Sequence, residues 1–88
     1  MNDANKTLST AHVNTLKESL SVREQEVEYY QINIDNYTIA LEEIGNLPPD
    51  ERAELSAFAE QLRTLLTGEK LEQKKARIML SALKRQVE

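Results

Sequence analysis

Residues 13–44 read VNTLKESLSVREQEVEYYQINIDNYTIALEEI, and this stretch decides the fold. Ten of its positions follow one another at alternating steps of three and four residues, and nine of the ten are apolar or aromatic. These positions are Val13, Leu16, Leu20, Arg23, Val27, Tyr30, Ile34, Tyr37, Leu41 and Ile44. Such a repeat places one apolar stripe along a helix, and it requires another helix to cover that stripe.

A turn is expected directly after this stretch, in the sequence Gly-Asn-Leu-Pro-Pro-Asp at residues 45–50. Glycine ends helices readily because it tolerates the left-handed conformation, and consecutive prolines cannot continue a helix. Pro49 suits the first turn of a following helix, where the negative charges of Asp50 and Glu51 interact favourably with the helix dipole. The second helical arm is therefore expected to start near Pro49.

The chain is expected to form a single domain over residues 9–88, with a frayed N-terminus at residues 1–8. Thr7, Ser9 and Thr10 are each suitable caps for the first helix. The two arms on either side of the turn have nearly equal lengths, which is typical of an antiparallel helical hairpin.

The apolar stripe of the second arm is interrupted. It reads Leu55, Phe58, Leu62, Leu65 or Leu66, Glu69, Glu72, Ala76, Met79 or Leu80, Leu83 and Val87. The pattern predicts a shift of about one residue after the two glutamates, and Gly68 lies within this interval. A break or bend of the second arm near Gly68 is therefore left open.

Folding the chain at the prolines pairs residues whose numbers sum to about 96. Apolar residues then face apolar residues, as in the pair of Leu41 with Leu55. Arg23, the one charge of the first stripe, falls opposite Glu72, with Glu69 one turn away. The sequence thus predicts an all-α, coiled-coil-like antiparallel hairpin with an ion pair of Arg23 with Glu69 and Glu72 between its helices. Basic side chains of the second arm are expected beside acidic side chains of the first.

Length and composition limit how such a hairpin is stabilised. A chain of 88 residues forms a marginal core by itself, and the absence of cysteine excludes a disulfide framework. Oligomerisation is the remaining common means of stabilising so small a protein, and it predicts a four-helix bundle built from two hairpins. No stretch has the length or hydropathy of a membrane span or a signal peptide, so a cytoplasmic protein is expected, and a membrane partner is not.

A second apolar surface is predicted away from the contact between the helices. In the first arm, Val22, Tyr29, Ile32 and Ile39 occupy positions that two-stranded coiled coils keep polar. Leu71 and Ile78 form a comparable set in the second arm. We expect these six side chains to serve self-association, with a dimer favoured, or the binding of a different protein.

Catalytic, cofactor-binding and metal-ligating residues are not expected, and the protein is not predicted to be an enzyme. His12 is the only histidine and no cysteine exists to join it in a metal site. With two glycines in the chain, a glycine-rich phosphate-binding loop of the usual kinds is excluded.

The sequence therefore favours a non-enzymatic protein–protein interaction module that acts through helical packing, such as an assembly factor, a chaperone or adaptor, or a stoichiometric inhibitor. The alternative is a small nucleic-acid-associated protein that uses the basic second arm. That arm contains Lys70, Lys74, Lys75, Arg77, Lys84 and Arg85. Because Glu69 and Glu72 interrupt these basic residues and the net charge is −4, nucleic acid is not the expected partner. A third alternative is an enzyme subunit that contributes no catalytic residues.

Overall fold

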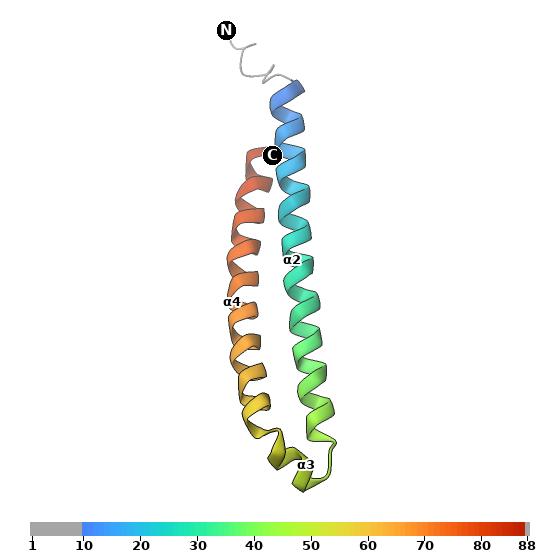
Figure 1. Cartoon of the computed structure of the whole chain (residues 1–88). Coiled ribbons are helices and arrows are strands. Elements are labelled where there is room, and N and C mark those ends of the chain that lie inside the picture. The colour runs from blue at the N-terminus through green and yellow to red at the C-terminus, as the bar shows by residue number, and fades with distance from the viewer. Residues whose placement is uncertain (1–9, 88) are drawn as a thin grey trace.

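The computed structural model describes residues 10–87, and these residues form an all-α antiparallel hairpin, which confirms the predicted fold class. Two long helices, α2 (Thr10–Gly45) and α4 (Ser56–Val87), lie side by side, and the short helix α3 (Pro49–Glu54) forms the base of the hairpin (Figure 1). The predicted frayed segment at residues 1–8 and the candidate caps Thr7 and Ser9 lie outside the described residues.

Helix α2 ends where the sequence predicts, but not by the expected backbone conformation. The amide of Asn46 donates to the carbonyls of Glu42 and Glu43 at 3.1 and 3.2 Å. Gly45 is the last helical residue, and it does not adopt a positive φ. The helix therefore stops because Pro48 and Pro49 cannot continue it, and a left-handed glycine is not needed.

Helix α3 begins with Pro49, as predicted, with Asp50 and Glu51 in its first turn. It spans only six residues. It ends at Leu55, whose amide donates to the carbonyls of Glu51 and Arg52 at 3.2 and 3.1 Å. The chain changes direction there before α4 begins (Figure 1). The second arm is thus interrupted at Leu55.

The interruption left open at Gly68 does not exist, because α4 is continuous from Ser56 to Val87. Gly68 is exposed, and a Cβ atom added to it would meet no atom within 4 Å. A glycine inside a helix costs roughly 1 kcal/mol relative to alanine. Packing of the helix against α2 on both sides of Gly68 offsets this cost.

The seam, meaning the line of contact between α2 and α4, uses an uninterrupted repeat on α4. Steps of four and three residues connect all its buried and half-buried members: Leu55, Ala59, Leu62, Leu66, Glu69, Gln73, Ala76, Leu80 and Leu83. The predicted shift after Glu69 is therefore wrong. Phe58, Leu65 and Met79 are larger than the alanines and the glutamine that occupy the seam, yet they are exposed beside it.

The pairing of residues across the seam also differs from the prediction. Asn33 contacts Glu69, and Gln31 contacts Gln73, so that paired numbers sum to 102 and 104. The predicted sum was about 96. The difference arises because α3 takes up residues 49–54 at the base, and this moves the centre of the hairpin towards the C-terminus. The first turn of α2 consequently projects past the end of α4 (Figure 1).

The core of the hairpin is small. Its buried hydrophobic residues are Ile34, Ala59, Leu62 and Ala76. No large side chain among residues 10–87 is fully buried. The Cα atoms extend over 73 × 15 × 14 Å, which is the shape of two helices packed along one line. Such a shape leaves most of each helix surface uncovered.

Candidate interaction surface

A polar layer crosses the seam near the middle of the hairpin. Gln73 is buried, and its Nε2 donates to Oε1 of Gln31 at 2.9 Å and to the carbonyl of Val27 at 3.2 Å. One turn away, Nδ2 of Asn33 donates to Oε1 of Glu69 at 3.3 Å. Polar groups in a helical seam favour one alignment of the helices over shifted ones, because a shift would leave the buried groups unpaired.

Glu69 is incompletely satisfied in this layer. Its Oε2 is buried and has no hydrogen-bond partner among the described residues. A buried polar atom without a partner destabilises a fold by about 1–3 kcal/mol. The polar layer therefore specifies the alignment of α2 and α4 at a cost in stability.

The predicted ion pair of Arg23 with Glu69 and Glu72 is not formed. Nη1 of Arg23 instead contacts Oε1 of Glu26 on the same helix at 2.8 Å. Glu72 pairs with Lys75 at 2.9 Å, also within one helix. The shifted alignment explains this result, because it places Arg23 near Met79. Each ion pair within residues 10–87 joins two side chains of a single helix, so the predicted charge pairing across the seam is wrong as well.

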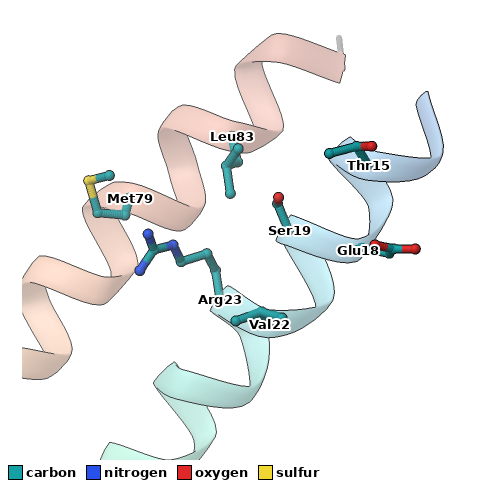
Figure 2. Close-up of a pocket in the computed structure, with 7 residues that line it drawn as sticks. All are labelled: Thr15, Glu18, Ser19, Val22, Arg23, Met79 and Leu83. Atoms are coloured by element: carbon teal, nitrogen blue, oxygen red, sulfur yellow. The ribbon is translucent and has the colours of Figure 1, made fainter. Parts of the chain in front are cut away.

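An open groove lies between the helices at the end of the hairpin that is far from α3. It has a volume of about 450 Å³. Its lining residues are Thr15, Glu18, Ser19, Val22 and Arg23 of α2 together with Met79 and Leu83 of α4 (Figure 2). The Arg23 side chain extends from α2 towards Met79 (Figure 2). The groove thus combines three apolar side chains with four polar or charged ones.

The groove belongs to a longer apolar row on one side of the hairpin. Val22 and Tyr29 are seven residues apart and share one side of α2, and Phe58, Leu65 and Met79 share one side of α4 for the same reason. All five are exposed. Because Val22 and Met79 line the same groove, the two rows run along the same side of the molecule. We call these five residues the apolar edge.

The six residues predicted to form an interaction surface are all exposed, but they do not form a single surface. Val22 and Tyr29 belong to the apolar edge. Ile32 and Ile39 each lie midway between two successive seam positions of α2 that are four residues apart. Both side chains therefore lie on the opposite side of the helix and face away from α4.

Leu71 and Ile78 face away from α2, because Leu71 lies two residues from both Glu69 and Gln73 in the seam. These two residues form an outer face of α4, and Ile32 and Ile39 form an outer face of α2. The two outer faces lie on opposite sides of the hairpin, with both helices between them. One partner that lies flat on the hairpin therefore cannot cover them both. The apolar edge is the only one of these surfaces to which both long helices contribute.

The sequence pattern did not identify Phe58, Leu65 and Met79 as surface residues, because it predicted Phe58 in the seam and offered Leu65 and Met79 as alternatives to Leu66 and Leu80. Hydrophobicity favoured Phe58 over Ala59, and it did not distinguish Leu65 from Leu66 or Met79 from Leu80. The signal that identifies the seam is the unbroken alternation of four and three residues, even where it passes through alanine and glutamine.

The described residues contain no group of three or more His, Cys, Asp or Glu side chains that could hold a metal ion. His12 is exposed in the first turn of α2. None of the described helices is long and apolar enough to cross a membrane.

Comparison with known proteins gives no protein-family model that matches this chain and no curated protein or solved structure with significant similarity.

Proposed function

We propose that this protein is a non-enzymatic interaction protein that self-associates and binds other proteins by helical packing. The observation that carries the proposal is the imbalance between buried and exposed apolar side chains. Eleven large hydrophobic residues within residues 10–87 are exposed, whereas no large side chain there is fully buried. Helices with apolar residues on several faces are normally covered on several faces.

The energetics of the single hairpin also favour self-association. Two of its four buried hydrophobic residues are alanines. Complete burial of a large apolar side chain contributes about 1.5–3 kcal/mol, and alanine contributes much less. The ordering of each residue costs about 1–2 kcal/mol of backbone entropy. A second hairpin that covers exposed leucine, phenylalanine and tyrosine side chains supplies burial that the isolated hairpin lacks.

A four-helix bundle made of two hairpins is the simplest assembly with this property. In such a bundle the outer faces with Ile32 and Ile39 and with Leu71 and Ile78 stay available for a protein partner. The proposal therefore extends to a cytosolic assembly factor, chaperone, adaptor or stoichiometric inhibitor that binds its target through these outer faces.

Nucleic-acid binding is less well supported. Lys75 is paired with Glu72 at 2.9 Å, and Arg63 is paired with Glu60 at 3.5 Å. Each carboxylate lowers the positive potential that phosphate binding requires. Lys74 and Arg77 are three residues apart and share one side of α4, whereas Lys75 lies on another side, so the basic groups are divided between two sides of the helix.

Sedimentation equilibrium tests the proposal directly. We expect a dimer or larger species, together with a midpoint of thermal unfolding that rises with protein concentration. A monomer across the micromolar range, with a melting temperature independent of concentration, would contradict self-association. Salt-sensitive co-purification of nucleic acid that is lost on neutralising Lys74, Lys75 and Arg77 would instead favour the nucleic-acid alternative.

A further inference from the structure

We propose that a second copy of this chain docks antiparallel on the apolar edge, with a two-fold axis that lies in the interface and runs across both helices at the level of Tyr29 and Glu72. This inference rests on the proposed self-association and specifies its surface and symmetry. Gln73 contacts both Val27 and Gln31, so residue 73 lies level with residue 29. The axis is therefore close to the middle of the paired region of the hairpin.

On α4, the residues on the two sides of this axis are self-complementary. On α4, Leu65 and Met79 lie seven residues before and after Glu72. On α2, Val22 lies seven residues before Tyr29, and Asn36 lies seven residues after it. A two-fold axis across the edge places α4 of one copy against α4 of the other. Leu65 then meets Met79 of the second copy, and each Tyr29 meets the other.

The groove at the open end is filled in this arrangement. It is lined by Val22, Met79 and Leu83, which provide apolar contacts for an incoming side chain. Leu65 of the second copy lies at the level of Met79 and supplies that side chain. Because the axis is two-fold, the groove of the second copy receives Leu65 of the first.

The charges near the axis are compatible with the same symmetry. Glu72 and Lys75 pair within each copy at 2.9 Å. Two antiparallel α4 helices bring Lys75 of one copy near Glu72 of the other, so that the two glutamates at the axis share two cations. This arrangement avoids an unpaired like-charge contact at the centre of the interface.

The area of the edge is sufficient for a stable dimer. Helix α4 has 32 residues, which corresponds to a length of about 48 Å. Two packed helices are roughly 19 Å wide with their side chains. One side of the hairpin therefore offers roughly 900 Å², and a stable interface buries about 800 Å² per partner. A second copy has the matching length to cover the whole edge.

Cysteine cross-linking tests this arrangement without interference, because the chain contains no cysteine. Tyr29→Cys should form a disulfide-linked dimer under mild oxidation, since the two positions meet at the axis. Ile32→Cys is the matched control. Ile32 and Tyr29 are both 62% exposed, but Ile32 lies on the outer face of α2, so this variant should stay monomeric on a denaturing gel.

Mixing single-cysteine variants determines the orientation. Leu65→Cys mixed with Met79→Cys should give a cross-linked heterodimer if the hairpins are antiparallel. Val22→Cys mixed with Met79→Cys should do so if they are parallel. Circular dichroism and sedimentation of each reduced variant confirm that it is folded and associated.

A disulfide-linked dimer of Ile32→Cys would overturn the inference while leaving self-association intact. The same holds if the mixture of Val22→Cys and Met79→Cys forms a cross-link and the mixture of Leu65→Cys and Met79→Cys does not. A monomeric wild-type protein, together with cysteine variants that form no cross-link, would overturn both the inference and the proposed self-association.

Discussion

The half of the hairpin next to α3 and the half at its open end differ in how well they are packed. Three of the four buried hydrophobic residues, Ile34, Ala59 and Leu62, lie on the α3 side of the polar layer formed by Gln73 and its partners. On the open side, Ala76 is the only buried hydrophobic residue among residues 10–87. That side also contains the groove of about 450 Å³.

The difference has a cause in the sequence. Next to α3, the seam positions of α2 are large and apolar, as at Ile34, Tyr37 and Leu41. At the open end the polar side chains of Ser19 and Arg23 line the groove together with Met79 and Leu83, and the buried seam residue of α4 in this half is the small Ala76. We infer that the closed half holds the hairpin together and that the open half depends on contacts from outside.

Equivalent leucine truncations in the two halves test this difference, and they carry the largest expected effect. Leu62 and Leu83 occupy the same heptad position of α4, but Leu62 is 5% exposed whereas Leu83 is only half-buried. Leu62→Ala should lower the free energy of unfolding by about 2–5 kcal/mol. Leu83→Ala should lower it by less than about half as much, because fewer contacts are lost.

Urea denaturation at one fixed protein concentration measures both values. Equal losses for the two variants would mean that the halves are equally well packed. A larger loss for Leu83→Ala than for Leu62→Ala would reverse the comparison.

The polar layer that separates the halves provides the second prediction. Glu69→Leu removes a buried carboxylate oxygen that has no partner, so it should raise the free energy of unfolding by about 1 kcal/mol or more. Glu60→Leu is the control, because Glu60 forms an exposed pair with Arg63 at 3.5 Å and should change stability by less than about 0.5 kcal/mol. Destabilisation by Glu69→Leu in the same urea experiment would show that the carboxylate stabilises the fold.

The sequence was sufficient to predict the antiparallel hairpin, the end of α2 and the start of α3. The stripe of α2 is almost entirely apolar, and two prolines leave the chain no means of continuing the helix. Both signals are local, so tertiary structure did not override them. Tyr30 and Tyr37 are half-buried and Tyr29 is exposed, as predicted from their heptad positions.

The seam of α4 and the pairing of the helices could not be predicted in the same way. Small and polar residues occupy seam positions at Ala59 and Gln73, so the sequence pattern indicated the neighbouring Phe58 and Glu72 instead. The six residues of α3 shift the pairing by about six to eight residues, which is about two helical turns. Nothing in the sequence marks Leu55 as the point where the arm changes direction. The ion pair of Arg23 with Glu72 depended on that alignment and was wrong with it.

The continuity of α4 provides the third prediction. Gly68→Ala should raise the free energy of unfolding by about 0.5–1 kcal/mol, because Gly68 lies inside a helix and an added Cβ meets open space. Gly45→Ala is the matched control at the last residue of α2, where the gain should be smaller. Thermal unfolding followed by circular dichroism compares the two. A loss of stability in Gly68→Ala would indicate that the helix is bent or interrupted there.

The smallest expected effect concerns Arg23 and Glu72. These residues are paired with Glu26 and Lys75 on their own helices. The effects of Arg23→Glu and Glu72→Arg on stability should therefore add, within about 0.5 kcal/mol, in a double-mutant cycle. A coupling energy well above this value would indicate that Arg23 and Glu72 form an ion pair across the seam. It would then favour the alignment predicted from the sequence.

The most direct test of the proposed assembly compares two adjacent residues of α4. Met79 belongs to the apolar edge, whereas Ile78 lies on the outer face, and both are exposed in the single hairpin. Sedimentation equilibrium of Met79→Glu should show a dimer weakened by more than about tenfold, because a charge enters the interface. Ile78→Glu should associate like the wild-type protein. If Ile78→Glu dissociates and Met79→Glu remains a dimer, the apolar edge is not the self-association surface.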